Sequence, residues 1–289
     1  MRLNDIGNVD CREGDRFDPV TDDTFDLIVT NPPFVISPQS AYLFRDSGLP
    51  VDEICRSIVQ EAPRYLREGG FCQVLASWAH LRGEPWRERL AGWVEESGCD
   101  AWVISREVLD PASYASTWLR HGAHGAGDDQ VAAGFDAWMD FYEQEGIEAM
   151  SLGLITLRKR SGATNWFRAE DAWQEFAAPY GDAIADWFAA HDFLESTDDE
   201  TLLGRTLSVA DDVRLEAVSW VDDDEWVSDQ FTLRRQTGLR WAGTIDDVGA
   251  QLVAGCNGQQ SVRELLTDIE VAEGLPIVRR LIEQGFLRP

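Results

Sequence analysis

Four consecutive residues, Asn31-Pro32-Pro33-Phe34, combine groups that can hold a planar amino group. The Asn31 side chain offers a carbonyl acceptor and a pair of N–H donors. The prolines lack an N–H and have a fixed φ, so they hold their carbonyl groups in place as free acceptors. The Phe34 ring supplies a flat apolar face for stacking. Acceptors that take the hydrogens of an amino group turn its lone pair toward an electrophile, which is catalysis by positioning and charge stabilisation.

A strand must place these residues. They follow Phe25–Thr30 (FDLIVT), an almost unbroken apolar run that is typical of a parallel strand buried on both faces. In an open α/β sheet, ligands bind at the carboxyl ends of such strands. The simpler interpretation is a strand-ending turn, because Pro-Pro ends any strand. The apolar run before the motif and the helical pattern after it favour a binding site.

The rest of the first half alternates between strand and helix patterns, which predicts an α/β layered sheet. We expect further strands at Asn8–Arg12, Phe71–Ser77, Asp100–Ser105 and Ala149–Arg158. We expect helices at Val51–Leu66, Pro85–Ser97, Tyr114–Arg120 and Gln130–Gly146.

The pattern changes after residue 162. A helical stretch is expected over Ala169–Leu194, followed by a group of short elements. The strands of this group are expected at Thr206–Val209, Val213–Val221 and Asp229–Arg235, and its helices at Asp246–Ala254, Val262–Ile269 and Pro276–Gln284. Three helices with a small antiparallel sheet resemble a winged-helix module of the α+β class.

The stretch FDLIVTNPPF resembles motif IV of class I S-adenosylmethionine-dependent methyltransferases that modify planar amino nitrogens. Examples are the release-factor glutamine N5-, ribosomal RNA guanine N2- and adenine N6-methyltransferases. The resemblance implies a Rossmann-like sheet and S-adenosyl-L-methionine as the cofactor. It also implies that Asn31, Pro32 and Phe34 are catalytic, that Asn31, Pro33 and Phe34 bind the substrate, and that Asn31 borders the cofactor.

The upstream stretch CREGDRFDPV fits the same family, in which a Gly-Asp pair after the third strand lies near the cofactor adenine. The resemblance implies that Asp15 accepts a hydrogen bond from the adenine amine, with Arg16 and the Phe17 backbone beside it. Without the resemblance, Gly14-Asp15 is a common turn. The resemblance covers roughly residues 8–159, and it implies that the last two strands of this region form an antiparallel pair.

The sequence departs from this family at its start. Family members carry a glycine-rich cofactor loop after their first strand and a ribose-binding acidic residue at the end of their second. Both belong upstream of Asn8 and are absent from these 289 residues. Without the first two strands, Phe25–Thr30 becomes an apolar sheet edge, which is an aggregation hazard. We therefore expect an N-terminally truncated sheet that binds S-adenosylmethionine poorly or not at all on its own.

These patterns predict three regions. Residues 1–162 form a partial methyltransferase domain, residues 163–200 a helical linker region, and residues 201–289 a small winged-helix-like domain. The helix expected at Val262–Ile269 carries Glu264 and Asp268 beside Arg263, which is poor for phosphate contact. We expect a structural or protein-docking role for this domain.

Other candidate residues carry weaker signals. His121 and His124 have the spacing of a metal-ligand pair, but they lie among glycines without a cysteine partner, so we predict no metal site. His80 follows a strand end and either lines the substrate cleft or is a satisfied surface residue. Asp110–Trp118 is either part of a substrate lid or a helix start with proline at its first position.

Composition bounds the protein class. The net charge is −27 and Lys159 is the only lysine, which argues against broad electrostatic binding of nucleic acid. The five cysteines are scattered, as in a reducing compartment, and there is no apolar run of transmembrane length. We expect a cytoplasmic protein with no membrane partner. Composition does not indicate an oligomeric state.

Two functions follow as hypotheses. The first is S-adenosylmethionine-dependent N-methyl transfer to a planar amino group of a protein glutamine or a nucleic-acid base, with weak or no activity for the truncated chain alone. The second is a non-catalytic fragment or scaffold that acts through its C-terminal module.

Overall fold

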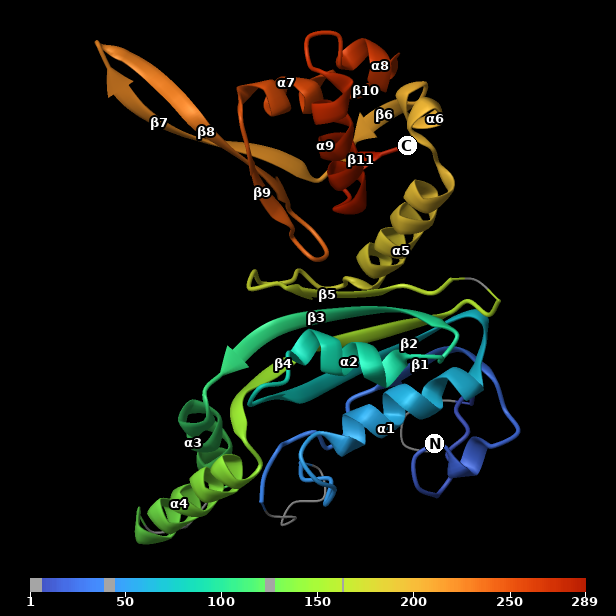
Figure 1. The fold of residues 1–289 in the computed structure, drawn as a ribbon, viewed down its shortest axis with the longest axis vertical. Helices are drawn as coiled ribbons and strands as arrows, with labels where there is room; N and C mark the ends of the chain where they lie inside the picture. Colours follow the sequence, from blue (N-terminus) through green and yellow to red (C-terminus); the bar gives the residue numbers. More distant parts are fainter. Residues whose placement is uncertain (1–6, 39–44, 123–127, 163) are drawn as a thin grey trace. The chain divides into compact units, whose positions relative to one another are not determined.

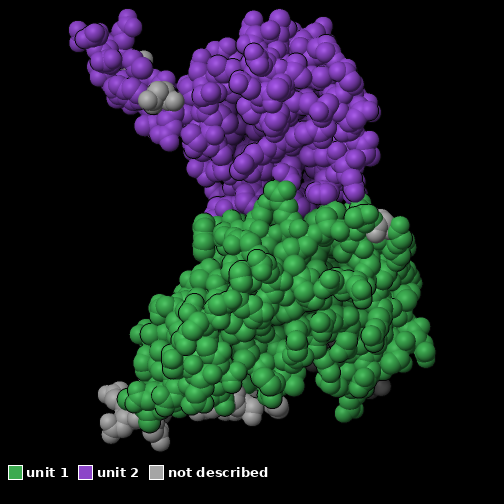
Figure 2. All heavy atoms as spheres, in the orientation of Figure 1, with its two compact units in different colours: residues 1–173 green, residues 174–289 purple. Residues whose placement is uncertain are grey.

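A computed structural model describes residues 7–38, 45–122, 128–162 and 164–289. The chain forms two compact units, residues 1–173 and residues 174–289 (Figure 2). Among the described residues, no helix is both long enough and apolar enough to cross a membrane.

A mixed sheet forms the centre of the first unit (Figure 1). Its described strands are β1 (Phe25–Thr30), β2 (Leu66–Leu81), β3 (Cys99–Leu109), β4 (Ile147–Lys159) and β5 (Phe167–Asp171), in the order β1-β2-β4-β3-β5. β1 is parallel to β2, β5 is parallel to β3, and β4 is antiparallel to both of its neighbours. The α/β class and the antiparallel pairing of the two late strands are therefore confirmed.

Two helices cover one face of this sheet (Figure 1). They are α1 (Glu53–Glu61), which continues into the 3-10 turn Ala62–Tyr65, and α2 (Trp86–Val94). Alternate residues of β2 (Cys72, Val74 and Ala76) point into the core that these helices close. The helix expected at Val51–Leu66 is shorter than predicted, because Pro63 lies in the 3-10 turn that leads into β2.

A helical hairpin connects β3 to β4 in the sequence. It consists of α3 (Pro111–Gly122) and α4 (Asp128–Gln144), and a second core lies where these helices meet β2 and β4. The Asp110 carboxylate accepts hydrogen bonds from the backbone N–H and the hydroxyl of Ser113, at 3.0 and 2.6 Å. Asp110 and Pro111 thus begin a helix, which is the simpler of the two interpretations of Asp110–Trp118.

Gly153 shows how tightly the sheet packs on its helical face. A Cβ at this position would lie 2.1 Å from the Ile104 carbonyl oxygen and 2.7 Å from the Trp78 indole. Trp78 is fully buried in the core under α1 and α2. Glycine on β4 therefore makes room for the indole of the neighbouring strand β2.

β1 forms one edge of the described sheet, as expected. Leu27 and Val29 are 60% and 66% exposed on it, and Leu75 of β2 is also exposed. The strand predicted at Asn8–Arg12 is wrong, because this segment has no strand conformation and is exposed. A strand needs a neighbour for its backbone hydrogen bonds, and β1 pairs only with β2 among the described residues.

The long helix predicted over Ala169–Leu194 is also wrong in its first half. Phe167–Asp171 is strand β5, and the helix α5 covers only Gly181–Ser196. Phe167 and Ala169 pack against the core of the first unit. Pro179 lacks an N–H and disfavours helical backbone before it, so the helix begins only after this proline. Residues 164–173 lie within the first compact unit.

The second unit is of the α+β class. Its helices are α5, α6 (Asp199–Leu203), α7 (Asp247–Gly255), α8 (Val262–Leu265) and α9 (Val271–Glu283). One described sheet has the order β10-β6-β11, with β6 at Thr206–Val209, β10 at Asn257–Ser261 and β11 at Leu287–Arg288. The other has the order β7-β8-β9, with β7 at Val213–Asp222, β8 at Glu225–Arg235 and β9 at Ala242–Ile245.

Several boundaries in this unit differ from the predicted ones. α8 ends at Leu265, and α9 begins at Val271 with Pro276 inside it. The helix was expected to start at Pro276 but begins five residues earlier. Gly274 and Leu275 are buried, so this added first turn also packs its apolar face into the core. Strands β9 and β10 were not predicted. The expected single sheet is divided into two.

Candidate functional site

Asn31 lies where the sequence predicts it, directly after the carboxyl end of β1. It is exposed, and its side chain has no hydrogen-bond partner in the described part of the chain. Pro32 is buried and Pro33 is half-buried, so the prolines anchor the segment while the amide faces solvent. No described donor bonds to the Pro32 carbonyl. The segment thus presents an exposed amide at one edge of the sheet, beside a buried proline whose carbonyl accepts no described hydrogen bond.

Two buried tyrosines fix the backbone that follows this segment. The Ile36 N–H donates to the Tyr114 hydroxyl at 3.2 Å, and the Tyr142 hydroxyl donates to the Ile36 carbonyl at 2.9 Å. Burial raises the pKa of Tyr114 to about 12 and raises the pKa of Tyr142 as well, so both phenols keep their protons at neutral pH. Helices α3 and α4 thereby hold both backbone polar groups of Ile36, five residues after Asn31.

A buried ion pair also holds this segment. The Arg45 guanidinium lies 2.8 Å from the Asp46 carboxylate, and both side chains are almost completely buried. The Val35 N–H donates to the Arg45 carbonyl at 3.0 Å, and Arg45 also donates to the Trp118 carbonyl at 2.9 Å. A buried pair with several hydrogen bonds fixes geometry more than it adds stability. The segment is therefore held rigidly.

Phe34 is only partly available for stacking. Its ring is half-buried and contacts both cores of the first unit. The Trp118 ring meets it edge to face, with 6.4 Å between centroids. α3 therefore borders the Asn31–Phe34 segment. The contribution of Tyr114, Tyr142, Arg45 and Asp46 was not evident from the sequence, because the residues that they contact lie up to 106 positions away.

Of the three residues predicted to contact the cofactor, Asp15 and Arg16 lie in an exposed turn before β1 and Asn31 lies after this strand. The Asp15 side chain is 74% exposed and lies 3.5 Å from the Arg16 guanidinium. Arg16 also pairs with Glu61 of α1 at 3.0 Å, and the Phe17 ring stacks on Tyr65 at 4.6 Å between centroids. Contacts to α1 and its 3-10 extension thus tie the turn to the helical face. Asp15 remains as an exposed acceptor.

His80 is satisfied within the fold. Its Nε2 lies 2.7 Å from the Ser151 hydroxyl, and its ring stacks on Trp86 at 5.7 Å. Burial lowers the pKa of His80, so the ring is neutral at pH 7. Of the two interpretations of His80, these contacts favour a residue that is satisfied within the fold over one that lines a substrate cleft.

A cavity of about 470 Å³ lies beside the starts of α1 and α2. Asp52 is buried on its wall, where it accepts a hydrogen bond from the Ala79 N–H at 2.8 Å and pairs with Arg89. Val51 has a φ of 48°, a strained conformation for a β-branched residue. The Asp52–Arg89 pair thus joins the end of β2 to both covering helices.

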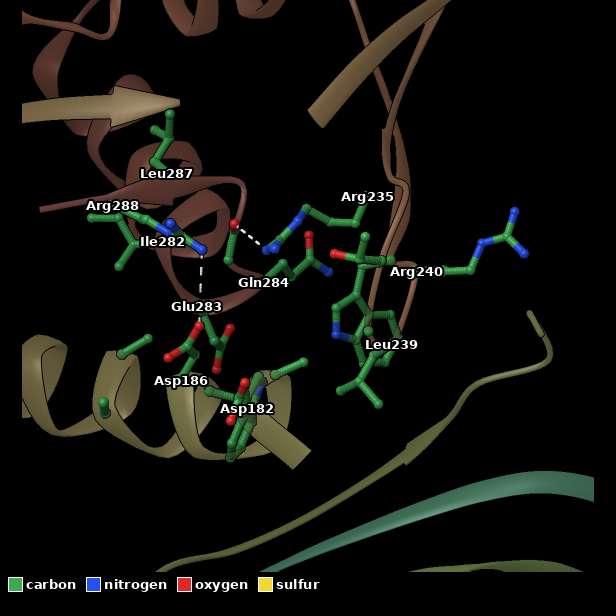
Figure 3. A pocket seen from close by; sticks show the side chains of 18 of the residues that line it. Asp182, Asp186, Arg235, Leu239, Arg240, Ile282, Glu283, Gln284, Leu287 and Arg288 are labelled. Atoms are coloured by element: carbon green, nitrogen blue, oxygen red, sulfur yellow. Dashed lines mark hydrogen bonds and ion pairs between the residues drawn. The ribbon is translucent and has the colours of Figure 1, made fainter. Parts of the chain in front are cut away.

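A larger cavity, of about 590 Å³, lies within the second unit (Figure 3). Asp182 and Asp186 of α5 form one side of it, and the end of α9 lies opposite. Arg235 points into the unit and donates to the Gly285 carbonyl, and Arg288 lies 4.0 Å from Asp186. Trp187 and Leu239 supply apolar walls. None of the residues predicted from the sequence as site residues lies here.

One side-chain group has the composition of a metal site. His191, Asp192 and Glu195 of α5 place three potential ligand atoms within 4.8 Å of one another. None is a free ligand, because each also interacts with other groups of the protein. The pair His121 and His124 cannot be compared with this group, because His124 lies outside the described residues and nothing is described of the His121 side chain.

The two units contain matches to different protein families. Residues 1–96, which include Asp15, Asn31 and the strands β1 and β2, match the methyltransferase small domain. This part of the chain is similar in sequence to that family. The match supports the predicted relation to S-adenosylmethionine-dependent methyltransferases. Residues 185–289 match a domain of unknown function. Curated proteins gave no match.

A search of solved structures matches part of the chain to several methyltransferases and to a cyclase. The cyclase SpnF is 19% identical, with a TM-score of 0.25, over 50% of this chain and 53% of that one. A putative sarcosine dimethylglycine methyltransferase from Galdieria sulphuraria is 14% identical, with a TM-score of 0.27, over 50% of this chain and 56% of that one. Phosphoethanolamine N-methyltransferase 2 from Haemonchus contortus, solved with S-adenosyl-L-methionine, is 10% identical. Its TM-score is 0.26, over 47% of this chain and 34% of that one. The chain spans about half or less of these structures, and likeness at this level carries no argument about activity.

Proposed function

We propose that this chain takes part in S-adenosylmethionine-dependent methyl transfer to a planar amino nitrogen, with Asn31–Phe34 as the acceptor-binding segment. One observation carries the proposal. The Asn31 amide is exposed and without a partner among the described residues, at the carboxyl end of a parallel strand. An exposed polar group on a rigidly held segment at this edge of a sheet is suited to a ligand.

The chemistry follows from the groups present. The Asn31 side-chain oxygen and the Pro32 carbonyl accept the two hydrogens of the amino group, and the accessible part of the Phe34 ring lies against its plane. These contacts direct the nitrogen lone pair toward an electrophile and stabilise the positive charge that develops on the nitrogen. No base is needed beforehand, because the nitrogen can lose its proton to water after it has been methylated. S-adenosylmethionine, when bound, supplies the electrophilic methyl group.

Among the described residues, only the adenine end of this cofactor has a suitable partner. Asp15 is an exposed carboxylate acceptor that suits the adenine amine, with Arg16 beside it. The Phe17 ring is already stacked on Tyr65 and so is committed to the fold. Because a single exposed acceptor gives little binding energy, we expect weak affinity of residues 1–289 for S-adenosylmethionine. Isothermal titration of the cofactor tests this, and tight binding would contradict it.

The acceptor class is part of the proposal. Protein glutamine and the exocyclic amines of nucleic-acid bases all present a planar –NH₂ group. The net charge of −27 disfavours long-range attraction of a polyanion. We therefore favour a protein amide over bare nucleic acid as the acceptor.

A labelling experiment tests the activity and the acceptor class together. Because weak affinity for the cofactor is expected, the chain is incubated with cell extract and an excess of S-adenosylmethionine that carries a tritiated methyl group, and the products are treated with protease or with nucleases. We expect label that protease releases and that nucleases leave in place. Label that nucleases release would move the acceptor to nucleic acid, and label that is equal with and without the chain would contradict the activity.

A non-catalytic scaffold that acts through its C-terminal unit is the second candidate. The separate core of the second unit favours it, since this unit can serve as a docking module without the sheet. The same labelling experiment discriminates between the two functions. A scaffold leaves the extract unlabelled, whereas a methyltransferase labels it.

A further inference from the structure

The hairpin of β7 and β8 leaves one edge of its sheet open. β7 pairs with β8 and with no other described strand, and residues 214–222 are all exposed. The hairpin extends away from the rest of the second unit (Figures 1 and 2). An isolated hairpin of this kind is only marginally stable in water, so its exposed strands are suited to pairing.

This edge lacks the usual protection against pairing. β7 has no proline and no lysine, and the residues Ala217–Val221 are uncharged. Val218 is 63% exposed, and Leu215 and Val221 are also exposed. The extra residue at the bulge between β7 and β8 lies on β8, so β7 itself stays regular. Long, regular and apolar edge strands associate with other strands unless charges or bulges prevent it.

The charges on β7 are arranged symmetrically about Val218. Arg214 lies four residues before it and Asp222 four residues after it. Arg214 donates only to the backbone carbonyls of Asp211 and Val213, at 3.1 and 2.7 Å, and has no carboxylate partner among the described residues. Within the same described part of the chain, Asp222 has no cationic partner. Both charges are therefore available for an external ion pair.

We propose that two copies of this chain associate by antiparallel pairing of their β7 strands, with a two-fold axis at Val218. In this register, Arg214 of each copy lies opposite Asp222 of the other, and Leu215 lies opposite Val221. Residues directly opposite in an antiparallel pair share a face, so two cross-strand ion pairs and two apolar pairs form. A contact of this kind is isologous and closes at the dimer.

The charge pattern also selects this register. A pairing centred on Ser219 would place Asp222 opposite Glu216 of the second copy, and like charges directly opposite each other are destabilising. In the proposed register, Glu216 instead lies opposite Trp220 and keeps its pair with Arg234, at 2.8 Å. The interface is small and the two copies repel through their net charge, so we expect a dissociation constant of about 10 µM at physiological salt.

Sedimentation equilibrium with charge-reversal variants tests the proposal. Arg214→Asp and Asp222→Arg should each weaken self-association about tenfold, because each places like charges opposite one another. Combining both substitutions in one chain should restore association. An equimolar mixture of the two single variants should form a heterodimer, because every cross-strand pair is then of opposite sign.

Val218→Lys should also abolish the dimer, because it places two lysines at the two-fold axis, whereas Val248→Lys on α7 is a matched exposed-valine control. Restoration in the double variant excludes loss of folding as the cause. A wild-type chain that sediments as a monomer up to about 100 µM would overturn the proposal. A dimer that is insensitive to Val218→Lys and to both charge reversals would do so too.

Discussion

At the scale of single residues, the candidate site is a free amide on a fixed backbone. The amide of Asn31 is exposed, while the backbone N–H and the carbonyl of Ile36 both bond to buried tyrosine hydroxyls. An unpaired buried carbonyl or N–H is costly, so these hydroxyls stabilise the segment through its backbone and independently of its side chains. The site therefore depends on residues that never touch the acceptor.

Tyr142→Phe removes the donor to the Ile36 carbonyl and leaves that oxygen buried without a partner. We expect a loss of about 1–3 kcal/mol in the free energy of unfolding, measured by urea denaturation. Tyr65→Phe is the control, because among the described residues the Tyr65 hydroxyl has no hydrogen bond; this change should stay within about 0.5 kcal/mol. Equal stability of the wild type and Tyr142→Phe would show that the hydroxyl does not hold the segment.

His80 makes stability depend on pH below neutrality. Burial lowers its pKa in the folded state, so the unfolded chain binds a proton more readily than the folded one. Its contribution is complete above the unfolded pKa and is lost as the pH falls through the folded pKa. His80→Gln should reduce the decline of the free energy of unfolding between pH 7 and about pH 5. An identical pH profile for both proteins would contradict this assignment.

At the scale of elements, the edge strand β1 is the feature that most constrains function. Parallel strands are normally covered on both faces, yet Leu27, Val29 and Leu75 are exposed on the face opposite α1 and α2. The strand that precedes Asn31 therefore lies at an open, apolar edge of the described sheet. Apolar edges of this kind lower solubility because they pair with other chains.

Replacing both exposed residues, Leu27→Lys together with Val29→Lys, should reduce aggregation without a large loss of stability. The lysines oppose strand pairing at the edge, and neither position lies in a core. Light scattering during heating measures this effect. The matched control is Val248→Lys, an exposed valine of α7 far from the sheet in sequence. Faster aggregation of the double variant than of the control would refute the role of this edge.

Much of the first sheet was predictable from the sequence, and the reasons are local. Phe25–Thr30 is an apolar run that ends at Pro-Pro, so its strand and the place of Asn31 follow directly. The support from Tyr114 and Tyr142 depends on contacts between distant segments, which no local pattern encodes. The strand β5 (Phe167–Asp171) was not predicted and its last three residues were taken as the start of a helix, because a five-residue edge strand has too few residues to show its period.

At the scale of the whole molecule, the chain combines two units with separate cores. The core of the second unit consists only of residues from 190 onward, and it includes buried residues of α6, α7 and α9. Residues 1–96 of the first unit match the methyltransferase small domain and include Asn31, whereas the second unit carries the open β7 edge. The proposed methyl transfer and the proposed self-association thus depend on different units.

Because the second unit has its own core, residues 174–289 should fold cooperatively when expressed alone. We expect a single urea transition by circular dichroism with a free energy of unfolding of about 5 kcal/mol or more. A fragment of residues 1–173 is the companion measurement. Non-cooperative unfolding of 174–289 would show that its core depends on the first unit.

The central claim is that Asn31 holds the methyl acceptor. The most direct test compares initial rates of tritiated-methyl transfer to cell extract by the wild-type chain, Asn31→Ala and Gln60→Ala. Gln60 is an exposed amide on α1 and serves as the matched control. We predict a loss of about a hundredfold for Asn31→Ala, which is the effect of removing one positioned polar group from a reacting centre, and a change within about twofold for Gln60→Ala. Equal rates for Asn31→Ala and the wild type would contradict the account.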